Sequence, residues 1–339
     1  MKSIFGLTVL FTLMACSQSS SAELDAEILS HPDPNVVQFY SDNLSRIEEL
    51  RETIALDDED VERRIDALVT LEVEYPLAAE ITARSYVSDE NERLALEAIQ
   101  VLQGNLIMSD HHMPHDMSGA SPRLRYMFEK HDASKAALRN AVADERDTVR
   151  VESASFLASL SDEQSLQIIS EGAASGLYSE VEAANLYTLA SDGVGEKYLQ
   201  GFVGNGELEA QQTAVAYLGS NPDYQSTIRD AYFLNADAPT VLRVEAARTL
   251  STYDVGFISY GPEITEQEGV DPALFEATMD SLIQLQKIRP ILTPDQSQLL
   301  LDKTQSYIGT QQLSTEDEAR FSDLTEELRT IAMQEQRLE

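Results

Sequence analysis

Three histidines and three methionines lie between residues 108 and 117 of this chain, within the stretch MSDHHMPHDMSG. The whole chain of 339 residues has only five histidines and eight methionines. Thioether sulfur is a soft ligand that selects Cu(I), whereas imidazole binds copper in both oxidation states, zinc and nickel. The stretch therefore predicts a metal site. Its six candidate ligands are His111, His112, His115, Met108, Met113 and Met117.

The chemistry of this stretch favours a copper ion, Cu(I) or Cu(II), over zinc. Pro114 interrupts any continuous helix, so His111 and His115 are not a ready pair on one helical face. The chain also has no His-Glu-x-x-His motif of the kind that holds a catalytic zinc. Mixed His/Met segments resemble the copper-handling segments of periplasmic copper proteins. The alternative interpretation is structural, with Met108 packing after Leu106 and with solvated loop histidines.

The chain begins MKSIFGLTVLFTLMAC, with a short positive end and then a mostly apolar run. The run is too short to span a bilayer as a mature helix, and this layout is typical of a bacterial export signal. The last four residues, Leu13 to Cys16, resemble the lipobox of bacterial lipoproteins. The resemblance implies a signal peptide over residues 1–15 and a lipidated Cys16 as the first mature residue.

Ser17 follows the cysteine, where an aspartate would imply retention in the inner membrane. The lipoprotein resemblance therefore implies an outer-membrane anchor facing the periplasm of a Gram-negative bacterium. The polar stretch SQSSSAELDAE predicts a flexible tether, which we place over residues 16–34. In this interpretation the lipid is the only contact with the membrane.

The balance of charge is strongly acidic, with 59 Asp and Glu against 24 Lys and Arg, a formal net charge of −35. Such a chain repels phosphate backbones, which argues against nucleic-acid binding. The acidity suits either basic partners or a saline habitat. The sequence carries neither a Gly-rich phosphate loop nor a G-x-S-x-G elbow, and its single cysteine falls in the lipobox. We therefore expect no enzymatic activity.

Six segments of small and aliphatic residues at helical spacing end in a leucine. These leucines are Leu71, Leu102, Leu157, Leu189, Leu218 and Leu250. The intervals between their sequence numbers are 31, 55, 32, 29 and 32, so only the second interval departs from a common length. A second amphipathic stretch follows in most units. Two short helices per unit of about 30 residues predict an all-α fold in which neighbouring helix pairs stack, an α-solenoid.

The stretch from Val149 to Leu157, with Arg150 and Ser153 inside it and Ser161-Asp162 after it, resembles a short HEAT repeat. The stretch from Leu242 to Leu250 is a second copy. The resemblance covers residues 58–290 and implies a right-handed solenoid of HEAT-like helix pairs.

The two ends of the chain depart from the repeat. Residues 35–57 predict an N-terminal capping helix. Residues 291–339 predict C-terminal capping helices, which we place over 294–308 and 315–336. The first of these starts at a proline in its first turn, and the second follows a Ser-x-x-Asp capping box.

Two long connections, 104–133 and 252–272, each follow a first helix, and we expect both loops on one edge of the solenoid. Insertions of this kind in repeat proteins often lie on the binding face. Two functions stay open. One is a lipid-anchored periplasmic scaffold that binds another protein, and the other is a metal-handling lipoprotein that uses the His/Met loop. A third, weaker interpretation is an acidic inhibitor or chaperone of a basic partner.

Overall fold

The structure is a computed structural model. It describes residues 26–56, 60–110, 121–191, 193–254, 256–266, 269–288, 294–310 and 315–335. These residues form helices and turns, and no strand occurs among them. The all-α fold class predicted from the sequence is therefore confirmed. The chain divides into two compact units, which are described separately: unit 1 is residues 1–178 with 189–191, and unit 2 is residues 179–188 with 192–339.

The N-terminal part of unit 1 is more ordered than the sequence predicts. Residues 26–29 are helical, Ile28 is buried, and Glu27 forms an ion pair with Arg84, with 2.7 Å between Oε2 and Nη1. The predicted flexible tether over 16–34 is therefore wrong for residues 26–34. An apolar side chain and an ion pair fix this segment to the helices behind it.

The predicted capping helix over 35–57 is divided into α2 (Pro34–Asp42) and α3 (Leu44–Ala55). Asn43 stands between them, and its side-chain amide donates to the carbonyl of Phe39 at 2.8 Å. Asparagine competes for backbone hydrogen bonds in this way, which favours a helix end over a helix interior.

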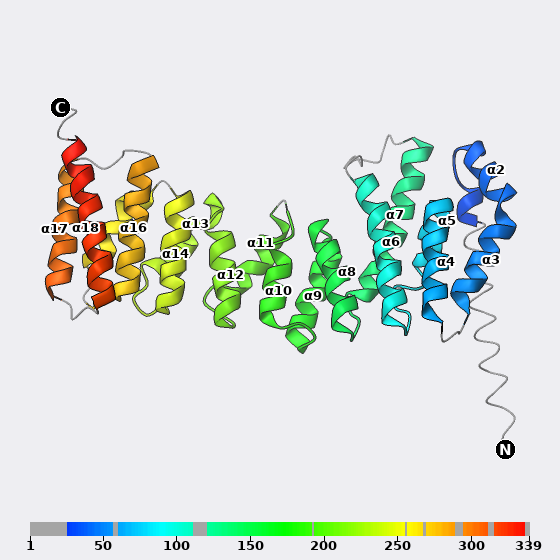
Figure 1. Cartoon of the computed structure of the whole chain (residues 1–339), viewed down its shortest axis with the longest axis horizontal. Helices are drawn as coiled ribbons and strands as arrows, with labels where there is room; N and C mark the ends of the chain where they lie inside the picture. Colours follow the sequence, from blue (N-terminus) through cyan, green and yellow to red (C-terminus); the bar gives the residue numbers. More distant parts are fainter. Residues whose placement is uncertain are drawn as a thin grey trace, which may run out of the picture. The chain divides into compact units, whose positions relative to one another are not determined.

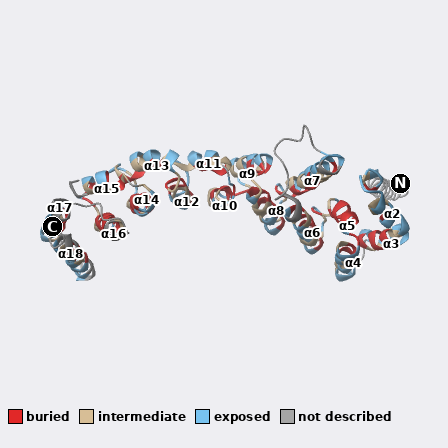
Figure 2. Ribbon diagram, turned by 90° about the horizontal axis from the view of Figure 1, so that it is seen from above, coloured by how far each residue is buried: buried red, intermediate tan, exposed pale blue. Residues whose placement is uncertain are grey.

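The rest of unit 1 is a series of paired helices. They are α4 (Val61–Glu74), α5 (Pro76–Ala83), α6 (Glu92–Asp110), α7 (Pro122–Ala141), α8 (Asp147–Ser159) and α9 (Glu163–Ser175). The helices α4, α6 and α8, here called the first helices of unit 1, contact one another in that order, and each also packs against the helix that follows it (Figure 1). Figure 2 shows their buried sides turned toward neighbouring helices and their exposed sides turned outward.

The repeat leucines of unit 1 explain this packing. Leu71, Leu102 and Leu157 lie on the three first helices, and all three are fully buried. Small residues such as Ala98 and Ser153 are fully buried one turn before two of these leucines. Small side chains let neighbouring helices approach closely, and the leucines fill the space between them.

Unit 2 repeats the same arrangement with shorter second helices. Its elements are α10 (Glu180–Tyr187), α11 (Val194–Leu199), η1 (Gln200–Phe202), α12 (Leu208–Leu218), α13 (Pro222–Ile228), the π-helical η2 (Arg229–Phe233), α14 (Thr240–Tyr253), α15 (Phe257–Tyr260), η3 (Gly261–Glu266), α16 (Pro272–Ile288), α17 (Pro294–Thr310) and α18 (Thr315–Glu335). The helices α10, α12, α14 and α16 contact one another in that order, and α16 and α17 both contact α18.

The repeat position in α10 is not the leucine that the sequence predicts. Leu189 lies beyond the end of α10 and is 45 % exposed, whereas Tyr187 is buried and stacks on Tyr198. With Tyr187 as the repeat residue, the interval from Leu157 is 30 residues and the interval to Leu218 is 31 residues. With Leu189 the same two intervals are 32 and 29 residues. The corrected register is more regular than the predicted one because a buried aromatic ring takes the place of the leucine.

The two predicted loop insertions are largely helical. Over 104–133, α6 continues to Asp110 and α7 already begins at Pro122, and Leu106 is fully buried. Over 252–272, α15 and η3 form a short second helix that packs beside α14 and α16 and buries Phe257 and Ile264. The prediction of two long loops is therefore wrong for 104–110 and 122–133 and for the helical parts of 252–272, where apolar residues pack onto the core, while residues 111–120 lie outside the described residues.

The C-terminal closing helices agree with the sequence prediction. The sequence predicts helices over 294–308 and 315–336, and α17 and α18 span Pro294–Thr310 and Thr315–Glu335. Phe275 of α16, Tyr307 of α17 and Phe321 of α18 form one aromatic cluster with ring centroids 3.9 to 5.6 Å apart. Within the described part of the chain, no helix is both long enough and apolar enough to cross a bilayer.

Candidate functional site

The predicted metal ligands lie almost wholly outside the described residues. This holds for His111, His112, Met113, His115 and Met117, and for the predicted lipidation site Cys16. Met108 is in the last turn of α6, but its side chain is outside the described part as well. Among the side chains that the structure does describe, no group of three or more His, Cys, Asp or Glu is placed to hold a metal ion.

The other two histidines are both described, and both lie in unit 1. His131 is buried within α7, which continues to Ala141. His31 packs edge-on against the ring of Tyr126, with 4.8 Å between ring centroids. Its Nδ1 accepts a hydrogen bond from the backbone N–H of Asp33 at 3.1 Å. His31 therefore belongs to the contact between the N-terminal segment and α7.

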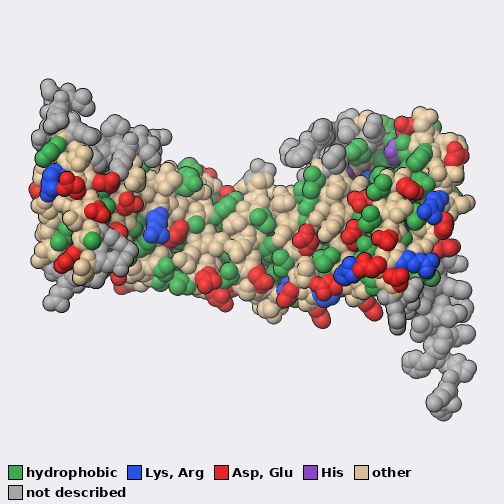
Figure 3. All heavy atoms as spheres, viewed as in Figure 1, with side chains coloured by type: hydrophobic (Ala, Val, Ile, Leu, Met, Phe, Trp, Pro, Cys, Tyr) green, Lys and Arg blue, Asp and Glu red, His purple; other side chains and the backbone are tan. Residues whose placement is uncertain are grey.

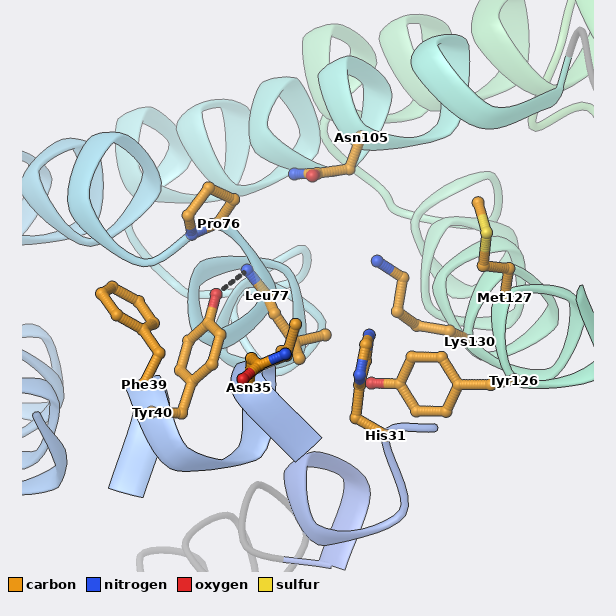
Figure 4. A pocket seen from close by; sticks show the side chains of 11 residues that line it. His31, Asn35, Phe39, Tyr40, Pro76, Leu77, Asn105, Tyr126, Met127 and Lys130 are labelled. Carbon is orange, nitrogen blue, oxygen red and sulfur yellow. Dashed lines mark hydrogen bonds between the residues drawn. The ribbon is translucent and has the colours of Figure 1, made fainter. Parts of the chain in front are cut away.

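His31 also lines a cavity of about 490 Å³ in unit 1. The cavity wall comes from the N-terminal segment and from α2, α5, α6 and α7. The lining residues are His31, Asn35, Val36, Phe39, Tyr40, Pro76, Leu77, Asn105, Tyr126, Met127 and Lys130. Figure 4 shows Tyr126 extending from α7 toward His31, and Lys130 extending into the space between α7 and the side chains of α2 and α5. Most of the wall is aliphatic or aromatic, and none of it is a carboxylate.

Behind the wall, a network of buried charges connects α5, α7 and the N-terminal segment. Glu80 is fully buried, forms an ion pair with Lys130, and accepts a hydrogen bond from Ser134 at 2.7 Å. Arg84 donates to both carboxylate oxygens of Glu27, at 2.7 and 3.0 Å, and to Ser134 Oγ at 3.0 Å. Buried charges are stable only when they are paired in this way. The two acidic and two basic side chains give the network no net charge, and their ion pairs connect the three segments.

The two tyrosine hydroxyls at the cavity differ in their partners. The hydroxyl of Tyr40 accepts a hydrogen bond from the backbone N–H of Leu77 at 2.9 Å (Figure 4). The hydroxyl of Tyr126 is buried and has no hydrogen-bond partner among the described residues. Burial raises the pKa of Tyr126, and the charges of Glu27 and Glu80 raise it further, so the phenol stays protonated. It is therefore a hydrogen-bond donor enclosed beside the cavity, without an acceptor among the described residues.

A second feature of unit 1 is the outer surface of the first helices. Val69 and Val73 stand one turn apart on α4 and are 37 % and 77 % exposed. Burial raises the pKa of Glu97 on α6, and the neighbouring carboxylate of Glu72 on α4 raises it further. The face of unit 1 seen in Figure 3 carries many carboxylates and few basic side chains, with hydrophobic side chains between them. This surface is both acidic and partly apolar.

Sequence reasoning missed the buried network and the cavity. One signal was present in α5, where Glu80 is the only charged residue in the run PLAAEITA. A lone carboxylate inside an apolar helix indicates a buried charge with a partner elsewhere. Its partner Lys130 lies two helices further along the chain, on α7, and no local pattern connects the two.

In comparisons with known proteins, no family model, no curated protein and no solved structure matches the chain.

Proposed function

We propose that this chain is a lipid-anchored scaffold of the bacterial outer membrane that faces the periplasm and binds another protein. The proposal includes a right-handed HEAT-like solenoid, attached to the membrane only through a lipidated Cys16. The order of helix contacts supports it, because within each unit every first helix packs on the next one along the chain. Stacked helix pairs of this kind present extended surfaces, which suit protein partners.

The observation that carries the proposal is the surface of α4 in unit 1. Val73 is 77 % exposed, and Val69 lies one turn away on the same exposed side. Apolar side chains surrounded by carboxylates suit a partner surface that combines apolar and basic residues. Complementary charge of this kind speeds association and orients the partner, while the apolar contacts add affinity.

Site-specific photo-crosslinking in living cells tests the binding surface. A photoreactive amino acid at Val73 should give a discrete crosslinked product, and so should one at Val69. The matched control is Ala174, which is exposed on α9, a second helix of the same unit. Crosslinks that occur equally at all three positions, or at none of them, contradict binding through the first helices.

The anchor has its own test. Cells labelled with a radioactive fatty acid should incorporate it into the wild-type chain but not into Cys16→Ala. The wild-type chain should also fractionate with the outer membrane. Labelling of the variant would show that this cysteine is not the lipidation site.

A second candidate function is copper handling through the His/Met stretch 108–117, and the observation in its favour is the concentration of six ligand residues there. The chain from residue 17 onward should bind Cu(I) stoichiometrically against a competing chelator. Binding should vanish in the triple variant His111→Ala, Met113→Ala, His115→Ala and persist in Met333→Ala. Failure to compete with the chelator removes this candidate and leaves the scaffold proposal intact.

A further inference from the structure

We propose that the cavity of unit 1 binds a neutral, largely apolar small molecule that accepts hydrogen bonds through a carbonyl or ether oxygen. This site lies among α2, α5, α6 and α7, and it is separate from the α4 surface proposed for the protein partner. The inference does not depend on the scaffold function, because it rests on the size, lining and charge of the cavity itself.

The size and lining of the cavity fit an apolar small molecule. A volume of about 490 Å³ lies within the range of small-molecule sites, which are mostly apolar and carry a few placed polar groups. Val36, Leu77 and Pro76 supply aliphatic surface, and Phe39 supplies an aromatic ring. Met127 adds a flexible side chain that adapts to the shape of a ligand.

Two polar groups of the wall, on Tyr126 and Lys130, can donate hydrogen bonds. The buried hydroxyl of Tyr126 has no partner among the described residues, and a buried polar group of this kind is unfavourable until it is paired. Lys130 contributes a second donor, because its ammonium has three N–H groups and the ion pair with Glu80 occupies one side of it. A carbonyl or ether oxygen on the ligand would accept from Lys130 directly, and from Tyr126 after a small shift of the side chains that enclose its hydroxyl.

The charges around the cavity select a neutral ligand. The ammonium of Lys130 is already balanced by Glu80, and the guanidinium of Arg84 is balanced by Glu27. An anionic ligand would therefore enter the cavity without a free counter-charge, in a chain whose net charge is −35. A cationic ligand would meet Lys130 in a wall that has no carboxylate.

The experiment uses Nile red, a neutral apolar dye with a ring carbonyl, whose fluorescence rises when it leaves water. The chain from residue 17 onward should bind it saturably at one site. Val36→Phe places an aromatic ring in the cavity, where it obstructs a ligand, and should weaken binding at least tenfold. The matched control Val37→Phe makes the same change at the next position of α2, outside the cavity lining, and should leave affinity within twofold.

Tyr126→Phe removes only the hydroxyl and should weaken dye binding about fivefold, the effect of one lost hydrogen bond. The anionic dye 8-anilinonaphthalene-1-sulfonate should bind more weakly than Nile red. Circular dichroism shows whether each variant is folded. If Val36→Phe does not fold, Met127→Trp places a bulkier ring in the cavity from α7 instead.

Three outcomes overturn the proposal. The first is the lack of saturable dye binding, and the second is equal binding by the cavity-filling variants and Val37→Phe. The third is tighter binding of the anionic dye, which would assign the cavity to anionic ligands instead. An unchanged affinity in Tyr126→Phe would show that the ligand does not accept a hydrogen bond from this hydroxyl.

Discussion

Replacing Glu80 with glutamine should destabilise unit 1 strongly. The side chain is fully buried, forms an ion pair with Lys130, and accepts a hydrogen bond from Ser134. Glutamine keeps the size and one acceptor oxygen but removes the negative charge that balances the ammonium. Removing one partner of a buried ion pair costs about 3–5 kcal/mol. Because Lys130 keeps 17 % of its side-chain surface in water, we expect the lower end of this range, about 3 kcal/mol.

Urea unfolding followed by circular dichroism at 222 nm measures this loss, and tyrosine fluorescence provides a second signal because the chain has no tryptophan. The double variant Glu80→Gln, Lys130→Met should be more stable than the sum of the single changes predicts, since it leaves no unbalanced charge. The control Glu62→Gln removes a carboxylate whose ion pair with Arg93 is exposed, with 63 % of each side chain accessible, and should leave the midpoint unchanged.

The reasoning fails if Glu80→Gln lowers the stability of unit 1 by less than about 1 kcal/mol, which is the range of exposed pairs. It also fails if the double variant loses the full sum of both single changes. In either case water or another side chain would pair with Lys130 in place of Glu80. The inference that the cavity favours a neutral ligand, because Glu80 balances Lys130, would then no longer hold.

Three further changes test other contacts. Burial alone would raise the pKa of Asp162, but hydrogen bonds from Arg139 at 2.5 and 2.9 Å outweigh it and the pKa is lowered. Asp162→Asn should therefore cost about 3 kcal/mol at pH 7. The difference from wild type should shrink below about pH 4, where the aspartate of the unfolded chain takes up a proton before that of the folded chain, and urea midpoints at pH 7 and pH 3 measure it. Glu97, whose pKa is raised by burial and by a neighbouring carboxylate, is destabilising when ionised, so Glu97→Gln should raise the melting temperature at pH 7 but not at pH 4. Gly172→Ala would place a Cβ atom 2.6 Å from the buried ring of Tyr178 and should cost about 1–3 kcal/mol in thermal unfolding.

The sequence predicts the helix pairs well because their packing is local and periodic. Leucines and small residues recur at the spacing of one helical face, and this pattern is sufficient to place α4, α8, α12 and α14. The closing helices α17 and α18 were equally predictable, since a proline and a capping box mark where they start.

The errors in the fold have physical causes that the sequence partly displays. Leu106 continues the apolar face of Leu102 by one turn, so the extension of α6 into the predicted loop was visible in the spacing. The spacing does not reveal that Tyr187 occupies a repeat position in place of a leucine. An aromatic ring can fill the same space from a different position along the helix.

The cavity could not be predicted because its wall comes from distant parts of the chain. Its lining runs from His31 to Lys130 and depends on how the N-terminal segment docks against α5 and α7. That docking in turn depends on the ion pair of Glu27 with Arg84, two residues 57 positions apart. Sequence periodicity reports which face of a helix is buried, but not which distant segment covers it.

Several basic side chains are buried inside the fold together with carboxylates, so the acidic balance of the composition persists at the surface. Four arginines are largely buried: Arg84, Arg139 and Arg150 in unit 1, and Arg243 in unit 2. In unit 1 these arginines stabilise carboxylates and carbonyl groups inside the fold. Because the chain has 59 acidic and 24 basic side chains, most exposed carboxylates have no cation beside them, and salt or a basic partner relieves their mutual repulsion. This imbalance is the physical reason to expect that a partner of the first-helix surface is basic, and that its association slows as salt is added.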